Sequence, residues 1–335
     1  MTNIVKGKNM NKKALKETLI ENAMYMILLT MIIIVTAFKP TFFSIANFTN
    51  ILMNSSVRII IALGVSGALI TRGTDLSAGR IVGVGAVIAG TLLQRPDYAS
   101  RFFPSLPDLP VWGVLILAMC ITGLLGLMNG LVVAILQVPP FIATLGMQSI
   151  VYGLSLVYTK SQPIGGLKES LTGIASGRIL GIPNLALIAI SVILVMWFLL
   201  NMTKFGKYIY AIGGNEAAAE VAGVNVKFTK IRVYALAGIC YGIAGVLLAA
   251  KSGGATANYG IGYELDAIAA CTIGGVSTAG GVGTISGIVS GVLIFELLKT
   301  SLQFLGVTPD LQYVAIGLVI VIAVAIDIRK YLVKK

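Results

Sequence analysis

The sequence predicts an all-α polytopic membrane protein with about ten transmembrane helices and both termini in the cytoplasm. Only 11% of its 335 residues are charged, whereas a soluble protein carries about 25%. Hydrophobic residues make up 57% of the chain, and the mean hydropathy is +0.93. Apolar runs near the ~20 residues that cross a bilayer core recur along the whole chain. These runs are continuously apolar, which excludes the alternating strands of a membrane β-barrel.

Ten apolar segments are each expected to form one membrane-spanning helix. They are residues 22–38, 51–71, 80–94, 111–136, 141–159, 183–201, 231–250, 264–279, 283–300 and 311–327. The first follows a basic, polar segment and has no small-residue cleavage site behind it, so it is a span and not a secretory signal. The eighth is short and rich in glycine. Residues 95–110 and 160–183 are expected to be ordinary exposed loops on the outer side.

Basic residues cluster in three places that an even number of spans puts on one side of the membrane. Five lysines lie in residues 6–16, five basic residues in 204–232 and four in 329–335, which is 14 of the 25 in the chain. This positive-inside pattern predicts a cytoplasmic N-terminal segment (1–21), a single transmembrane domain (22–328) with a cytoplasmic loop at 202–230, and a cytoplasmic basic tail (329–335). Because the clusters flank spans, the net charge of +12 indicates membrane orientation and not nucleic-acid binding.

Small residues in the spans point to packing, either within one subunit or between subunits. Gly283, Gly287 and Gly291 form a GxxxGxxxG row, which lets helices approach closely in lipid. Two further GxxxG pairs are Gly126/Gly130 and Gly238/Gly242. The three cysteines, Cys120, Cys240 and Cys271, lie in or beside apolar segments. We expect them to be small buried residues and not disulfide or metal ligands.

The chain lacks the motifs of an enzyme. No G-x-x-x-x-G-K-[ST] loop is present, because Gly206-Lys207 is followed by Tyr208, so no ATP site is expected in this chain. It contains no histidine, which removes the commonest metal ligand and proton relay. It also has no nucleophile-and-base constellation and no paired carboxylates in an obvious cleft. We therefore expect neither catalysis nor a bound cofactor or metal.

Charged residues within spans are the default functional candidates of a membrane protein, and most of them here have a structural explanation. Arg58 lies near the start of a span and could snorkel to the interface. Glu296 and Lys299 are one helical turn apart and could pair locally. Glu264 and Asp266 open the eighth span, where the helix dipole favours carboxylates.

Two stretches predict interruptions of the helices. "TRGTDLSAGR" (71–80) places Arg72, Asp75, Ser77 and Arg80 between two apolar segments. Broken helices of this type line transport pathways, although a short cytoplasmic turn would give the same pattern. "VPPFIATLG" (138–146) is a second candidate, since Pro139 and Pro140 end any helix that runs into them. Thr144, with Asn129, Gln148 and Tyr152, supplies polar groups on central spans that could contact a substrate or simply join helices.

The polar insert "AIGGNEAAAEVAGVNV" (211–226) predicts a short helix between glycines. Asn215 is a good N-cap, Glu216 lies in the first turn, and Gly223 stands at the C′ position. A helix of about seven residues is marginal alone in water. We therefore expect residues 215 to 223 to dock against a partner, or else to fold back on the membrane domain.

Four stretches, in order, resemble the signatures of sugar-type ABC importer permeases, the ribose/galactose/xylose family. They are "TRGTDLSAG", "VPPFIATLG", "FGKYIYAIGGNEAAAEVAGVNV" and "GGVSTAGGVGTISG". The likeness spans nearly the whole chain and is closest to the galactose/methyl-galactoside branch. It implies that the insert is the segment coupled to the ATPase, with the contact residues Gly213, Gly214, Asn215, Glu216, Ala218, Ala219 and Gly223. One departure is that the family's usual glutamate falls on Ala217, while Glu216 stands where proline is common.

The resemblance implies a homodimer in a bacterial cytoplasmic membrane. It also implies an ATPase subunit with two fused nucleotide-binding domains, which holds ATP and Mg, and an extracytoplasmic sugar-binding protein. The predicted function is import of a monosaccharide by alternating access, with galactose or methyl galactoside as the first candidate. Ribose or another pentose is the alternative cargo. Two alternatives come from other functional classes. An ion-coupled secondary transporter would need carboxylates or histidine at the midplane of the membrane, and a membrane-embedded enzyme would need a catalytic constellation.

Overall fold

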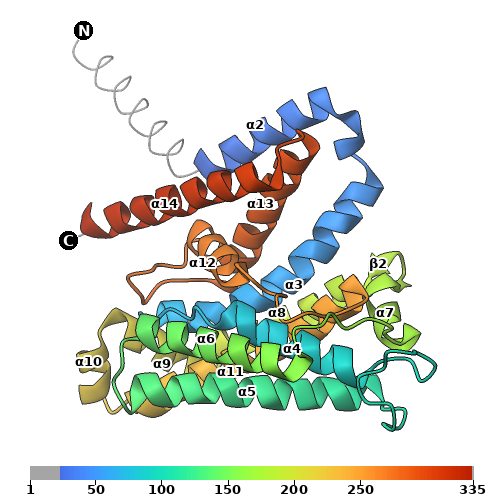
Figure 1. Cartoon of the computed structure of the whole chain (residues 1–335). Coiled ribbons are helices and arrows are strands. Elements are labelled where there is room, and N and C mark those ends of the chain that lie inside the picture. Colours follow the sequence, from blue (N-terminus) through green and yellow to red (C-terminus); the bar gives the residue numbers. More distant parts are fainter. Residues whose placement is uncertain (1–22, 334–335) are drawn as a thin grey trace.

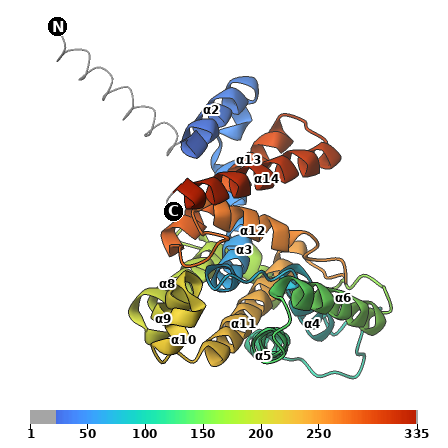
Figure 2. The ribbon, with the colours of Figure 1, turned by 90° about the vertical axis from the view of Figure 1, so that its left-hand side faces the viewer.

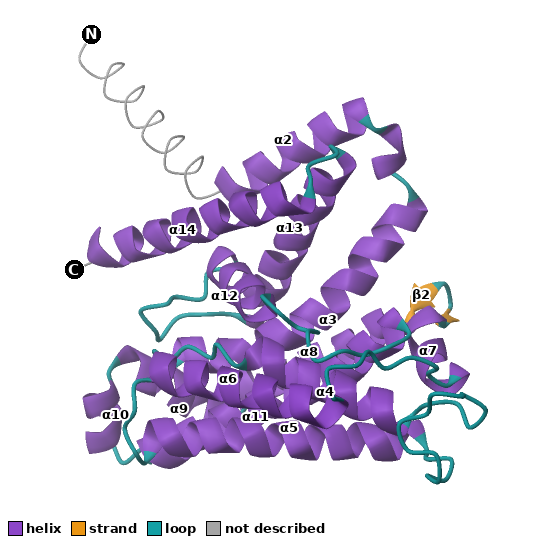
Figure 3. Ribbon diagram, in the orientation of Figure 1, coloured by secondary structure: helices purple, strands orange, loops and turns teal. Residues whose placement is uncertain are grey.

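The computed structural model describes residues 23–333, so the whole of the predicted segment 1–21 and the last two lysines lie outside the described residues. Within this range the chain forms thirteen α-helices, one 3-10 helix and one two-stranded hairpin (Figures 1 and 3). The fold is thus helical, as expected, apart from a hairpin of two residues per strand.

Ten of the helices overlap the ten segments expected to be spans. They are α2 (Ala23–Phe38), α3 (Ile45–Ile70), α4 (Ala78–Leu92), α5 (Val111–Ala134), α6 (Pro140–Thr159), α8 (Asn184–Met202), α11 (Val226–Ser252), α12 (Tyr263–Ile273), α13 (Ile285–Phe304) and α14 (Pro309–Val333). Of the described helices, α3, α5, α6, α8, α11 and α13 are long and apolar enough to cross a membrane alone. The 3-10 helix η1 (Pro40–Phe42) joins α2 to α3.

Helix α12 is shorter than expected. It has 11 residues and ends at Ile273, whereas the sequence suggested a span to residue 279. The reason is Gly275, whose φ of +84° lies in the left-handed region and redirects the chain at the helix end. At the other end of the chain, α14 continues to Val333, so most of the expected basic tail is helical.

Two segments expected to be loops contain helices that were not predicted. Residues 202–230 hold α9 (Lys204–Gly214), which was not expected, as well as the predicted short helix, α10 (Glu216–Val221). Residues 160–183 hold α7 (Glu169–Ser176) and the antiparallel pair β1 (Arg178–Ile179) and β2 (Ile182–Pro183). Leu171 of α7 is fully buried, so this segment is a packed element and not an ordinary exposed loop. Figure 1 shows α10 and α7 at opposite ends of the bundle.

Helix α11 is the centre of the fold. It packs against α3, α4 and α5, and its Tyr234 and Tyr241 are among the largest fully buried side chains. In the most apolar windows of α3 and α11, 78% and 72% of the residues are buried, against 22% to 28% in α5, α6 and α8. The latter three therefore present apolar faces outward. Figures 1 and 2 show α2, α13 and α14 as a second group, with α12 between the groups.

Glycine rows make several of the helix contacts. A Cβ atom on Gly287 would collide with the carbonyl oxygen of Gly274, and one on Gly291 with that of Ala270, both at the end of α12. Gly283 lies against Ile70 of α3, within the same chain. The pairs Gly126/Gly130 and Gly238/Gly242 also lie where α5 meets α11.

The cysteines differ in burial. Cys240 and Cys271 are buried as expected, whereas Cys120 is exposed on the outer side of α5. All three are free thiols. The expectation of three buried cysteines is therefore wrong for Cys120, because α5 is covered on one side only.

We predict that Gly287→Leu lowers the yield and melting temperature of the detergent-solubilised protein, because its side chain would separate α12 from α13. Overpacking of this kind costs about 1–3 kcal/mol. The matched control is Gly146→Leu, since Gly146 is a glycine of α6 with no atom within 4 Å of its Cβ position. Equal melting temperatures for the two variants would show that the α12–α13 contact is loose.

Candidate functional site

The break between α3 and α4 comprises residues 71–77 and has a defined backbone. Helix α3 ends in a Schellman motif: the Gly73 N–H donates to the Ala68 carbonyl (2.8 Å) and the Arg72 N–H to the Leu69 carbonyl (3.0 Å). Arg72 occupies the left-handed C′ position, with φ +63°. This position favours glycine, and a side chain there costs roughly 1–2 kcal/mol. Strain of this kind concentrates at functional sites, so the arginine side chain is a candidate for a specific task.

Asp75 lies at the centre of the break and is fully buried. Its Oδ1 accepts hydrogen bonds from the Ser77 N–H (3.0 Å) and hydroxyl (2.6 Å), and its Oδ2 accepts one from the Tyr241 hydroxyl (3.0 Å). Asn129 Nδ2 in turn donates to Ser77 Oγ (2.8 Å). Asp75 and Ser77 thus join α4 to α5 and α11, and their side chains are enclosed by protein.

The second predicted break lies against the first. Pro139 caps α6 and Pro140 is its first residue, while Gln137 just before them has φ +55°. The Thr144 hydroxyl accepts from the Leu76 N–H (3.1 Å) and donates to the Pro140 carbonyl (2.8 Å). Thr144 therefore joins the start of α6 to the α3–α4 break.

Helix α10 has the caps that the sequence predicts and is slightly shorter than expected. The Asn215 side chain accepts from the Ala218 N–H (3.0 Å). At the other end, Gly223 has φ +84°. The Gly223 N–H donates to the Glu220 carbonyl (2.9 Å) and the Val224 N–H to the Ala219 carbonyl (3.0 Å), which completes a Schellman motif.

One side of α10 is packed and the other is free within this chain. Ala219 is buried against Ile212 and Val226, whereas Val221 is 91% exposed. The Glu216 carboxylate accepts a hydrogen bond from Lys230 Nζ of α11 (2.7 Å). Beside this pair lies a cavity of about 300 Å³, whose lining includes Gln137, Pro139, Pro140, Glu216, Glu220 and Lys230. An exposed valine at a helix end is an apolar surface that a second protein chain can cover.

Arg72 joins the α3–α4 break to the segment that leads into α10. Its Nε donates to the Gly213 carbonyl (2.7 Å) and its Nη2 to the Gly214 carbonyl (2.5 Å). The Ile70 carbonyl accepts from the Gly281 N–H (2.8 Å), so the end of α3 also contacts the glycine loop before α13. Gly213 and Gly214 are thus acceptors for Arg72, a contact across 141 positions that no local pattern in the sequence indicates.

Arg80 lies apart from Arg72 and Asp75. Its guanidinium stacks over the Tyr152 ring, 3.9 Å from the centroid, and donates to the Ala257 carbonyl (3.3 Å). The Tyr152 hydroxyl donates to Asn258 Oδ1 (3.0 Å). The predicted polar residues thus fall into three neighbouring groups: Arg72 toward α9, Asp75 with Ser77 and Thr144 in the interior, and Arg80 toward α6 and the connection before α12.

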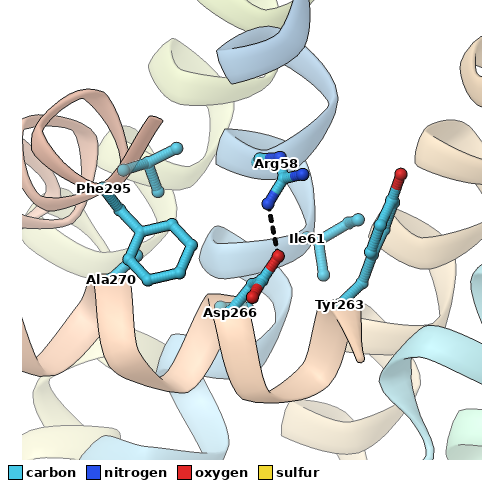
Figure 4. A pocket seen from close by; sticks show the side chains of 8 residues that line it. Arg58, Ile61, Tyr263, Asp266, Ala270 and Phe295 are labelled. Carbon is cyan, nitrogen blue, oxygen red and sulfur yellow. Dashed lines mark hydrogen bonds and ion pairs between the residues drawn. The ribbon is translucent and has the colours of Figure 1, made fainter. Parts of the chain in front are cut away.

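An intramembrane ion cluster joins α3, α12 and α13. Arg58 pairs with Asp266 (Figure 4) and, through Nε, with Glu296 (3.0 Å), and Lys299 pairs with Asp266 (3.4 Å). This corrects two expectations: Arg58 does not snorkel, and Glu296 does not pair with Lys299. The reason is that α12 places Asp266 between the two cations. The space beside the cluster, about 10 Å³, holds no more than one water, so the cluster is not a ligand cavity.

Comparison with known proteins identifies the family. The model of the family described as "Branched-chain amino acid transport system / permease component" matches residues 47–324. The galactose/methyl galactoside import permease protein of Escherichia coli is 47% identical, over 97% of this chain and 99% of its own length. That of Haemophilus influenzae is 48% identical over 94% and 96%. The ribose import permease protein of E. coli is 37% identical over 94% and 96%. No solved structure matches the chain.

These likenesses cover almost the full length of the chain and of its relatives. Permease components of this kind are multi-pass proteins of the bacterial inner membrane; they are not enzymes, take no cofactor, and work with a separate ATPase and a binding protein. The chain belongs to the family of permease components of branched-chain amino acid transport systems.

Proposed function

We propose that the chain is the membrane subunit of an ATP-driven importer for galactose or methyl galactoside. The two galactose/methyl galactoside permeases above are 47% and 48% identical to it, against 37% for the ribose permease. Ribose or another pentose is the second candidate cargo. The observation that carries the mechanism is the double hydrogen bond from Arg72 to the carbonyls of Gly213 and Gly214.

The proposed assembly is a homodimer with ten spans per subunit and both termini in the cytoplasm. An ATPase with two fused nucleotide-binding domains, which holds ATP and Mg, binds α10, and a sugar-binding protein docks at the opposite side. The positions of α10 and α7 at opposite ends of the bundle support this orientation (Figure 1), as do the basic residues around α10.

In the proposed cycle, closure of the ATPase displaces α10. The movement reaches Gly213 and Gly214 through the single residue between α9 and α10, and Arg72 carries it to the end of α3. Lys230 carries it in parallel to the base of α11 through Glu216. Since α3 and α4 meet at the same break, a change at Arg72 alters their angle and opens the pathway to one side and then the other.

Ion coupling is a poorer explanation, because most of the described intramembrane carboxylates are already engaged. Asp75 accepts three hydrogen bonds, and Asp266 and Glu296 are paired with Arg58. A coupling carboxylate must exchange its ion or proton during the cycle, and each of these would first have to leave a buried partner.

We predict that Gly223→Val abolishes sugar uptake while the permease level stays near normal. Valine at φ +84° strains the C′ position of α10 by about 1 kcal/mol or more and adds bulk where the ATPase docks. Uptake, ATPase co-purification and hydrolysis stimulated by the loaded binding protein are measured in one preparation. The matched control is Gly306→Val, at φ +78° between α13 and α14, which should retain uptake. Normal uptake and stimulated hydrolysis in Gly223→Val would rule out α10 as the coupling element.

We predict that Arg72→Gly lowers both the melting temperature and uptake. Glycine relieves the left-handed strain of roughly 1–2 kcal/mol, but the two charge-assisted hydrogen bonds that are lost are worth about 1.5–3 kcal/mol each, and their loss reduces coupling roughly 10-fold or more. Lys160→Gly is the control, because Lys160 has φ +51° at the end of α6; it should raise stability without affecting uptake. If Arg72→Gly transports normally, Arg72 does not transmit the movement.

A further inference from the structure

The connection between α11 and α12, residues 253–262, runs along one face of α4. A Cβ atom on Gly90 would lie 2.8 Å from Ala255 Cβ, and one on Gly83 would lie 2.6 Å from the Tyr259 carbonyl oxygen. One on Gly79 would collide with the Gly260 carbonyl. The three glycines thus form a groove for the backbone of this connection. Helix α12 consequently begins inside the bundle, next to the start of α4.

This connection is non-helical and partly open. Asn258 and Ile261 are exposed within the single chain, although the segment lies beside α4, which is part of the apolar domain. Irregular backbone at this depth is tolerated only where protein or a water-filled cavity covers it. The exposed side of residues 253–262 therefore faces water or a second subunit, and not lipid.

Four side chains from four elements gather beside this segment. Arg80 of α4 stacks on the Tyr152 ring of α6 and donates to the Ala257 carbonyl; the Tyr152 hydroxyl donates to Asn258. Arg80 and Tyr152 are both partly exposed. The fourth is Glu264, in the first turn of α12. Its carboxylate lies against Gly79, and the charge of Arg80 acts on it.

Glu264 is the member whose bonding is incomplete. The residue is 6% exposed, and its Oε2 has no hydrogen-bond partner among the described residues. A buried carboxylate oxygen without a donor is unfavourable by about 1–3 kcal/mol or more, and such groups are rare in native proteins. This oxygen lies against Gly79 of α4, so an outside donor reaches it only when α12 shifts relative to α4.

We propose that Arg80, Tyr152, Asn258 and Glu264 form a contact site for the monosaccharide on its way through the permease. The inference rests on the proposed function for the class of cargo. Glutamate accepts hydrogen bonds, arginine donates them and asparagine does both, which suits neighbouring sugar hydroxyls. The tyrosine ring offers an apolar surface to the C–H face of a pyranose. One cation and one anion give the site no net charge, so it suits a neutral polyol better than an ion.

In this structure the members of the site partner one another. Arg80 covers the Tyr152 ring and Asn258 accepts from its hydroxyl, so a sugar must replace these contacts when it binds. Its affinity is then set by a difference between two sets of contacts and is low, as a transit site requires. The Oε2 of Glu264, once it leaves its place against Gly79, adds a hydrogen bond that the unliganded state lacks.

The test is protection of a single cysteine from a membrane-impermeant maleimide. The background is Cys120→Ser, which removes the exposed thiol and leaves the two buried ones. Asn258→Cys, assembled with the ATPase in nanodiscs, is labelled with and without millimolar D-galactose, and L-galactose is the stereochemical control. Leu305→Cys, an exposed position after α13, is the control for labelling. We expect D-galactose, and not L-galactose, to slow labelling of Asn258→Cys alone by about 3-fold or more.

Two variants in the same background separate contact from structure. Tyr152→Leu removes the ring, and Glu264→Gln removes the charge and replaces one of the two acceptor oxygens by a donor; each should raise the galactose concentration for half-protection about 10-fold. In uptake assays with the binding protein, both should change the ratio of galactose to methyl galactoside transport. The site is overturned if galactose does not protect Asn258→Cys, or if both variants leave the half-protecting concentration and the selectivity unchanged. In either case, galactose uptake by the unmodified permease would still uphold the proposed function. If the unmodified permease imports no galactose, the cargo assignment itself fails, and the site with it.

Discussion

The buried carboxylate of Asp75, surrounded by hydrogen-bond donors, fixes the path of the chain between α3 and α4. Non-helical backbone inside an apolar domain is stable only if its polar groups find partners within the protein. Asp75 supplies that organisation, because it binds Ser77 beside it and Tyr241 on α11, and Ser77 accepts from Asn129 on α5. The geometry of the break thus depends on three helices at once. Its outcome is that Arg72 points to α9 and Arg80 to α6, so the two arginines serve different neighbours.

Helix α12 is held between the two groups of helices by charge. Asp266 binds Arg58 on α3, while Glu264, two residues earlier, is directed to the start of α4 and lies within the field of Arg80. Its other end packs on α13 through glycine. A helix of 11 residues is too short to cross the bilayer core without the adjoining connection, and these contacts replace the long apolar face that anchors a full-length span. Any rearrangement of α3 against α4 must therefore displace α12 as well.

The sequence predicts what depends on local composition. The spans follow from apolar runs, and the caps of α10 follow from Asn215 and Gly223, since each acts within a few residues. The helices α7 and α9 were not predicted, because both are short and neither forms a continuous apolar run. The ion cluster was missed for another reason: Arg58 and Asp266 are 208 positions apart, and their pairing depends on where α12 begins. Helix α12 ends early because Gly275 has a left-handed conformation, and the sequence does not distinguish Gly275 from the other glycines near it.

At its glycines, α11 contacts neighbouring helices through backbone atoms and not through side chains, and this affects how those helices can move. Gly245 contacts the backbone of Val82 and Ala86 on α4, and Gly238 that of Thr122 on α5. Interdigitated side chains resist displacement, because each must change rotamer before its helix can move past the next ridge. Two backbone surfaces have no rotamers to change. The neighbouring helices can therefore slide along α11 by small steps, and the contact stays closed to water while they do so.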